Sequence, residues 1–165
     1  KDWKKNSFSK INLDSFRKNI DIHLNSFSWI SKLIADTMSR SKNGGSIINL
    51  GSIYGIVGQD LNTYLGTDMK ESMTYSIIKG GLTNLSRQMA SYYGKYNIRV
   101  NTVCPGGVED SKQSSTFKKN YSKKTPLKRL AKSHEVASAI LFLSSDASSY
   151  ITGTSLIVDG GWTAI

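Results

Sequence analysis

With 165 residues, 38% of them hydrophobic, and a formal net charge of +10, the chain is long enough for one globular domain, residues 1–165, and too apolar to be disordered. The charge raises the question of a nucleic-acid partner, but helix-turn-helix, RNP and zinc-finger patterns are absent, so none is expected. No apolar run approaches the roughly 18–20 residues of a membrane span, so no membrane segment is expected. The single cysteine excludes an internal disulfide and makes a cysteine metal site unexpected, and we expect no other metal site. A reducing cytoplasm is therefore the expected location.

Helical periodicity dominates the first part of the chain. A 3.6-residue repeat predicts a long amphipathic helix over residues 13–40. The repeat consists of Leu13, Phe16, Ile20, Leu24, Phe27, Ile30, Ile34 and Met38. Two glycines, Gly44 and Gly45, end it, and the apolar run 46–50 indicates a buried strand. Residues 54–73 have no clean period and contain three glycines, which predicts a loop.

The second part of the chain alternates helices with strands. Residues 74–93 and 135–143 carry helical apolar stripes, whereas 98–103 and 155–158 are rich in β-branched residues and indicate strands. This alternation predicts a parallel sheet covered by helices on both faces. Such sheets bind ligands outside the carboxyl ends of their strands. Ser52, Pro105-Gly106 and Gly160-Gly161 each follow a strand end, so we expect them to line one edge of the sheet.

One segment concentrates the positive charge. Between Ser111 and His134 there are eight basic residues and no acidic one. A solvated, mobile surface segment is the favoured interpretation, and a lid over an anionic ligand is the alternative. Phe117 and Tyr121 lie four residues apart within this segment. The favoured interpretation is that they form a small packed pair, and the alternative is that they are contacts of a lid.

Three residues suggest acid–base chemistry. Tyr75 and Lys79 are four residues apart in the first turns of the second long helix and therefore share a face. The helix N-terminus and the neighbouring ammonium both favour an ionised phenol. Ser52 is placed to hydrogen-bond a substrate oxygen that Tyr75 protonates. This set suits the interconversion of a carbonyl and an alcohol, which requires a hydride carrier that the protein does not itself supply.

Four stretches occur in one order along the chain: GGSIINLGSIYG, YSIIKGGLTNLSRQMA, NIRVNTVCPGG and SSDASSYITGTSLIVDGGW. Together they resemble the C-terminal two-thirds of a short-chain dehydrogenase/reductase. The resemblance implies an α/β fold with a Rossmann-like, doubly wound parallel sheet, NAD or NADP as cofactor and a small-molecule substrate. It also implies a homo-oligomer, a dimer or tetramer formed through the two long helices.

The resemblance assigns roles to individual residues. Tyr75 is implied to be the catalytic acid/base. Lys79 is implied to favour its ionisation and to hold the nicotinamide ribose, and Ser52 to orient the substrate oxygen. Pro105-Gly106 falls where the family contacts the nicotinamide end of the cofactor, with Val108 following.

The chain departs from the family at its start. The strand, glycine-rich turn and helix that seat the cofactor's pyrophosphate in the family have no counterpart here. The sheet is therefore expected to be incomplete, with the N-terminal cofactor-binding half absent, as in a fragment of a longer product or a truncated gene. The alternative to an active oxidoreductase is then a non-catalytic fragment without a dinucleotide site.

Two internal departures concern the site. His23 stands where the family usually has an asparagine that bends the first long helix and holds a relay water; it is a candidate proton relay, although an interfacial histidine with satisfied hydrogen bonds is favoured. Ser52 and Tyr75 are 23 residues apart, more than is usual in the family, and the extra segment, 60–73, is expected to form a substrate-side loop. This loop is similar to that of a branch linked to flagellin modification and nonulosonic-acid sugar synthesis, which implies a sugar-like anionic substrate.

Overall fold

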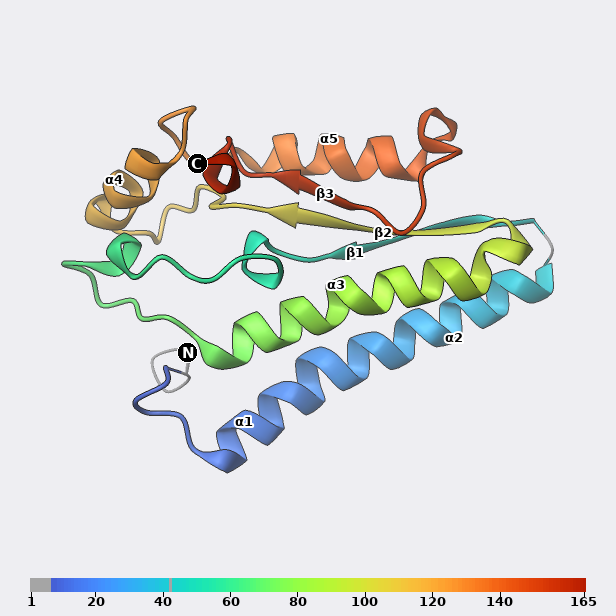
Figure 1. Ribbon diagram of the computed structural model, residues 1–165, viewed down its shortest axis with the longest axis horizontal. Coiled ribbons are helices and arrows are strands. Elements are labelled where there is room, and N and C mark those ends of the chain that lie inside the picture. Colours follow the sequence, from blue (N-terminus) through green and yellow to red (C-terminus); the bar gives the residue numbers. More distant parts are fainter. Residues whose placement is uncertain (1–6, 42) are drawn as a thin grey trace.

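The centre of the fold is a three-stranded parallel sheet (Figure 1), seen in a computed structural model that describes residues 7–41 and 43–165. The strands β1 (Gly45–Leu50), β2 (Ile98–Pro105) and β3 (Ser155–Val158) lie in that order. The central strand β2 is the most deeply buried, because neighbours cover both of its edges and helices cover both of its faces. The predicted parallel sheet is confirmed.

Helices form a layer on each side of the sheet (Figure 1). On one side lie α1 (Leu13–Ile20), α2 (Ser26–Ser41) and α3 (Met73–Tyr93), and on the other lies α5 (Ser133–Ser144). The helix α4 (Ser115–Lys124) and the short 3₁₀ helices η3 (Ile53–Gly55) and η4 (Leu61–Tyr64) lie beyond the carboxyl ends of the strands. The fold therefore gathers its irregular segments at the edge where parallel sheets bind ligands.

The predicted helix 13–40 is interrupted. A π-helical turn, Asp21–Asn25, separates α1 from α2, and both the backbone N–H and the hydroxyl of Ser26 donate to the carbonyl of Asp21. Apolar stripes of surface helices usually face a core, yet the buried residues of α2 are Ser31 and Ala35. Ser31 and Ala35 are small, so the face of α2 that carries them can lie close to the sheet. Most of the larger apolar side chains of α2 lie on its other faces and are exposed.

The basic segment contains a helix that the sequence interpretation missed. In α4, the Ser114 hydroxyl oxygen caps the N-terminus by accepting from the Phe117 N–H. Phe117 and Tyr121 are buried, and they join a cluster with Ile53, Leu130 and Trp162. The packed-pair interpretation is confirmed. The favoured interpretation of a solvated surface segment is wrong here, because one face of the lysine-rich helix packs on the body of the protein.

The strand ends meet at one edge, as predicted. Leu50 pairs with Val103, and Pro105 pairs with Val158. The N–H of Gly51 still donates to the carbonyl of Val103, at 2.8 Å, so the β1–β2 register continues past the strand. Ser52 therefore emerges level with the end of β2.

Candidate active site

Ser52 is buried where the chain leaves β1. Its hydroxyl oxygen accepts a hydrogen bond from the Tyr54 N–H at 3.2 Å and so caps η3. A Cβ atom on Gly51, the residue before Ser52, would lie 3.0 Å from the sulfur of Cys104. Burial raises the pKa of the Cys104 thiol, so a neutral, buried thiol lies next to the Ser52 turn.

Tyr75 and Lys79 lie one turn apart at the start of α3. The Ser72 hydroxyl oxygen caps this helix by accepting from the Tyr75 N–H at 3.2 Å. The Tyr75 side chain is 40% exposed, and the Lys79 Nζ lies 5.7 Å from the centroid of its ring. The Lys79 Nζ also donates to the carbonyl of Leu50 at 2.7 Å. Lys79 therefore joins the turn that carries Tyr75 to the strand end that precedes Ser52.

The environment of Lys79 is partly dry. Burial lowers the pKa of its ammonium below the ordinary value of 10.5, and the nearby Cys104 opposes that shift. A partly desolvated ammonium interacts more strongly with neighbouring negative charge than one in bulk water. Lys79 is therefore suited to stabilise an anion next to it.

A glycine permits the close contact between the Ser52 turn and α3. A Cβ atom on Gly55 would lie 2.7 Å from the carbonyl carbon and oxygen of Lys79 and 3.0 Å from the nitrogen of Gly80. Only a residue without a side chain allows two backbones to approach so closely. This contact brings the Ser52 turn and the Tyr75–Lys79 turn together.

The segment after β2 is fixed at the same edge. The Gly106 N–H donates to the Val158 carbonyl at 2.9 Å, and the Gly107 N–H donates to the Tyr121 hydroxyl at 2.6 Å. Val108 then forms an isolated parallel bridge with Ala131. Pro105-Gly106 and Val108, the predicted cofactor contacts, thus lie in a backbone held by β3 on one side and by α4 on the other.

His23 lies in the π-helical turn between α1 and α2. Leu24 of this turn packs against α3, since a Cβ on Gly81 would lie 2.9 Å from its Cδ1. His23 itself is exposed and stacks on Phe27, with ring centroids 6.5 Å apart. The structure places His23 one residue from the helix contact, and its relay role stays a prediction.

Sequence reasoning missed a glutamine. The Gln59 side chain, between η3 and η4, forms hydrogen bonds to Ser72, Ser76 and Tyr64. Nothing in the local pattern marks it. The unusual separation of Ser52 and Tyr75 was the one available indication of such a residue, because a longer loop between them needs contacts that hold its two ends together.

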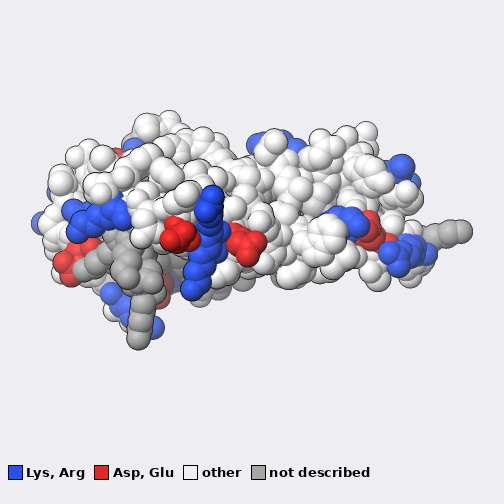
Figure 2. Space-filling view, turned by 90° about the horizontal axis from the view of Figure 1, so that it is seen from below, with Lys and Arg blue, Asp and Glu red and all other residues white. Residues whose placement is uncertain are grey.

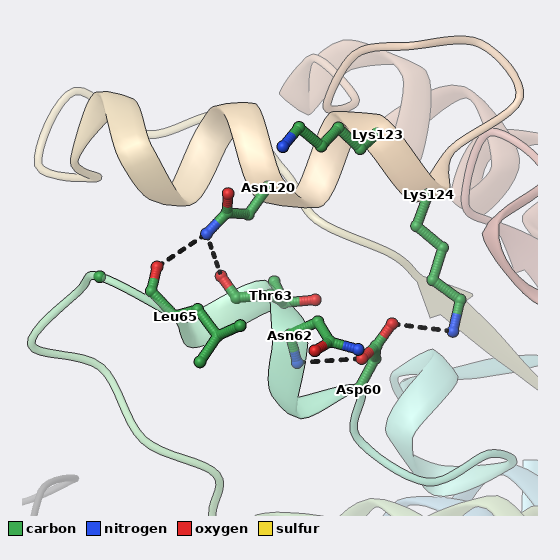
Figure 3. A pocket seen from close by; sticks show the side chains of 8 residues that line it. Asp60, Asn62, Thr63, Leu65, Asn120, Lys123 and Lys124 are labelled. Atoms are coloured by element: carbon green, nitrogen blue, oxygen red, sulfur yellow. Dashed lines mark hydrogen bonds and ion pairs between the residues drawn. The ribbon is translucent and has the colours of Figure 1, made fainter.

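A cavity of about 580 Å³ lies between η4 and α4 (Figure 3). The Asn120 side-chain amide donates to the carbonyl of Leu65 at 2.8 Å, and Lys124 pairs with Asp60 at 3.2 Å. Lys123 projects from α4 at the rim. None of the lining residues belongs to the Ser52, Tyr75 and Lys79 group. The extra segment thus contacts α4 directly and forms one wall of the cavity.

Two further properties concern residues 7–41 and 43–165. No group of three or more His, Cys, Asp or Glu residues lies there in an arrangement that could hold a metal ion. No helix in this part of the chain combines the length and the apolar character needed to cross a bilayer.

Comparisons with known proteins agree on one family. The family model described as Enoyl-(Acyl carrier protein) reductase matches residues 1–163. Post-translational flagellin modification protein A from Campylobacter coli is 33% identical over 162 residues, covering 98% of this chain and 62% of that protein. Trans-4-hydroxycyclohexanecarboxylate dehydrogenase from Sinomonas cyclohexanicum is 37% identical, covering 96% of this chain and 56% of that protein.

A solved structure gives the same result. The short chain dehydrogenase from Leptospira borgpetersenii, with bound NAD+, is 32% identical and has a TM-score of 0.87. The match covers 95% of this chain and 59% of that one. The Rossmann-like α/β fold expected from the sequence is thus confirmed, and the chain spans about three-fifths of the length of these relatives.

Proposed function

This chain belongs to the short-chain dehydrogenase/reductase family, and we propose that it carries the catalytic part of an NAD(P)-dependent oxidoreductase that interconverts an alcohol and a carbonyl. The position of Lys79 carries the proposal. Its ammonium lies against the Tyr75 ring and bonds to the carbonyl of Leu50, two residues before Ser52. A phenol, a cation and a hydroxyl thus share the ligand-binding edge of a parallel sheet.

In the proposed reaction, Tyr75 exchanges the proton. During alcohol oxidation its phenolate oxygen takes the substrate's hydroxyl proton while the hydride leaves the carbinol carbon, and during reduction the phenol returns a proton to the carbonyl oxygen. Lys79 stabilises the phenolate by Coulomb attraction. The Ser52 oxygen accepts from the Tyr54 N–H, so its own hydrogen can be donated to the substrate oxygen.

The residues at this edge fit the nicotinamide end of a dinucleotide, which would supply the acceptor or donor of the hydride. Lys79 is proposed to bind the ribose, and Pro105-Gly106 with Val108 to line the nicotinamide. The hydrogen bonds of Gly106 and Gly107 support this, because they fix the backbone of that segment at the sheet edge. The NAD+ in the Leptospira relative supports the cofactor class, NAD or NADP.

We further propose a small, sugar-like substrate with an anionic group. Lys123 at the rim of the cavity beside η4 supports an anion, whereas Lys124 is already paired with Asp60. The Campylobacter relative is named for flagellin modification, and the Sinomonas relative acts on a hydroxylated cyclic carboxylate. A hydroxylated cyclic carboxylate has both the hydroxylated ring of a sugar and the negative charge of the proposed anionic group.

The proposed assembly is a homo-oligomer formed through the long helices. Figure 2 shows the helical side of the molecule, where charged side chains occur in a few groups and large areas are uncharged. The exposed apolar residues of α2 and α3 include Phe27, Trp29, Ile30, Leu33, Ile34, Ile77 and Tyr92. Exposed apolar patches of this kind support protein association. The proposed location is the cytoplasm, whose reducing conditions suit a single buried cysteine.

The test uses the protein expressed from its complete coding sequence. Oxidation of a panel of sugar acids and hydroxylated cyclic carboxylates is followed with NAD+ and with NADP+ by the absorbance of the reduced cofactor. Tyr75→Phe should keep its circular dichroism spectrum and lower kcat about 10²- to 10⁴-fold. Tyr92→Phe, at an exposed tyrosine of the same helix, should change neither. Near-normal turnover by Tyr75→Phe contradicts the acid/base assignment.

A further inference from the structure

The side chain of Gln59 uses all of its hydrogen-bonding capacity on residues around Tyr75. Its Nε2 donates to the Ser72 carbonyl at 2.8 Å and to the Ser76 hydroxyl at 2.9 Å. Its Oε1 accepts from the Ser72 N–H and from the Tyr64 hydroxyl, both at 3.1 Å. A side-chain amide has two donor hydrogens and two acceptor lone pairs, so Gln59 is fully satisfied in this arrangement.

These bonds hold the turn of α3 that carries Tyr75. The first N–H groups of a helix have no partner within the helix, and here the Tyr75 N–H relies on the Ser72 hydroxyl. Gln59 binds Ser72 through both its carbonyl and its N–H and binds Ser76 on the far side of Tyr75. The cap residue therefore cannot move without breaking bonds to Gln59, and Tyr75 moves only with its cap.

The same segment also carries Ser52. Gly55, three residues after Ser52, touches the backbone of Lys79 and Gly80, and Gln59 lies four residues further on. Residues 52–59 are therefore attached to the start of α3 at two places, by Gln59 at Ser72 and Ser76 and by Gly55 at Lys79 and Gly80. This double attachment fixes the Ser52 turn relative to the Tyr75 turn, although 23 residues separate the two in sequence.

We propose that Gln59 is a positioning residue that holds Tyr75 in register with Ser52 for proton exchange. The inference rests on the proposed function of Tyr75 and adds a residue that acts through the protein, because all four of its side-chain hydrogen bonds go to protein groups. The reaction rate falls steeply when reacting groups are displaced by about 1 Å. Loss of the Gln59 clamp, its four hydrogen bonds to Ser72, Ser76 and Tyr64, should therefore lower kcat more than it lowers the free energy of unfolding.

The clamp also reaches the lysine-rich helix. Tyr64, which donates to Gln59, stacks on Phe117 of α4 with ring centroids 6.3 Å apart. Asn120 and Lys124 hold the same stretch of η4 from the other side (Figure 3). The extra segment is thus held at α3 through Gln59 and at α4 by side-chain contacts. These two sets of contacts explain how the loop between Ser52 and Tyr75 can be longer than usual without displacing Tyr75.

The kinetic test is made on the protein from its complete coding sequence, with the substrate panel described above. Gln59→Met keeps the length of the side chain and removes every hydrogen bond, so kcat should fall about tenfold to a hundredfold with a smaller change in KM. Gln59→Glu keeps the acceptor for the Ser72 N–H and Tyr64 but sets an acceptor-only carboxylate oxygen against the Ser72 carbonyl, so its kcat should fall at least as far. A kcat of Gln59→Met within twofold of the wild type overturns the proposal.

A matched control separates positioning from general destabilisation. Tyr93 lies at the other end of α3 and donates to Asp36 at 2.7 Å. Tyr93→Phe removes that bond and should lower the melting temperature without lowering kcat. If Tyr93→Phe and Gln59→Met lower kcat equally at equal loss of melting temperature, Gln59 has only a structural role.

A second measurement does not depend on turnover. Amide hydrogen exchange at Tyr75 and Ser76 should be at least about tenfold faster in Gln59→Met, while exchange in β2 is unchanged. Tyr93→Phe should leave exchange at Tyr75 as in the wild type. If the wild type oxidises no substrate of the panel, the proposed function fails and exchange alone decides: unchanged protection at Tyr75 overturns the positioning role.

Discussion

A single methyl group at Gly55 should separate the Ser52 turn from α3. In Gly55→Ala, the new Cβ would lie 2.7 Å from the carbonyl carbon and oxygen of Lys79, whereas ordinary contacts begin at 3.4 Å. The clashing atoms are backbone atoms of a helix, so no side chain can rotate away. The two segments must move apart by several tenths of an ångström.

The cost follows from that displacement. Overpacking in a well-packed region destabilises by about 1–3 kcal/mol, so the urea midpoint of Gly55→Ala should fall at an unchanged m-value. Turnover should fall further than stability, up to about a hundredfold, because the methyl group forces apart the turns that hold Ser52 and Lys79. Both quantities are measured on the purified protein at a temperature where the variant is folded.

Two neighbouring glycines provide controls. A Cβ on Gly58, in the same loop, would have no atom within 4 Å, so Gly58→Ala should be neutral or stabilise slightly by reducing the freedom of the unfolded chain. A Cβ on Gly80 would meet the Gly55 carbonyl oxygen at 3.7 Å, an ordinary contact. Gly80→Ala should therefore be tolerated, with a helix-propensity gain of up to about 1 kcal/mol. If Gly55→Ala behaves like Gly58→Ala in both assays, the inferred backbone contact is wrong.

Two further predictions concern α5 and the turn that precedes it. Leu143→Ala should destabilise by about 2–5 kcal/mol in urea unfolding because Leu143 is fully buried, whereas Leu141→Ala, at a side chain 69% exposed, should be near neutral; equal effects would contradict the packing of α5. The hydrogen bond from Arg129 lowers the pKa of Glu135 from 4.5 to about 2. A lowered carboxyl pKa stabilises the fold above the unfolded value and is lost as pH falls toward the folded one. The melting-temperature difference between wild type and Glu135→Gln should therefore be constant above about pH 5 and shrink from about pH 4.5 to 2; a difference that is undiminished at pH 2 contradicts the assignment of the ion pair.

Local sequence predicted most of the framework because the relevant interactions are local. The four-residue spacing of Tyr75 and Lys79 places them on one helix face whatever surrounds the helix, and in the structure the Lys79 Nζ lies 5.7 Å from the centroid of the Tyr75 ring. Strands that alternate with helices predicted the parallel sheet. Composition misled at α4, because its lysines suggested a solvated surface segment, whereas Phe117 and Tyr121 bury one face of the helix.

The direction in which a helix faces was less predictable. The apolar stripe of residues 13–40 identified an amphipathic helix but not what would cover it. Ser31 and Ala35 face the sheet instead, and much larger residues such as Trp29 are exposed. An apolar stripe predicts that one face of the helix is covered, but it does not say whether this chain or another chain covers that face.

By itself, the sequence determined the three strands and the helices other than α4, that the strand ends share an edge, and that Tyr75 and Lys79 lie on one face. Only the tertiary structure decided how Ser52 reaches them. The backbone contact at Gly55 and the four hydrogen bonds of Gln59 join segments far apart along the chain. Such contacts depend on where the folded chain places each segment in space, and no repeat or spacing along the chain encodes that position.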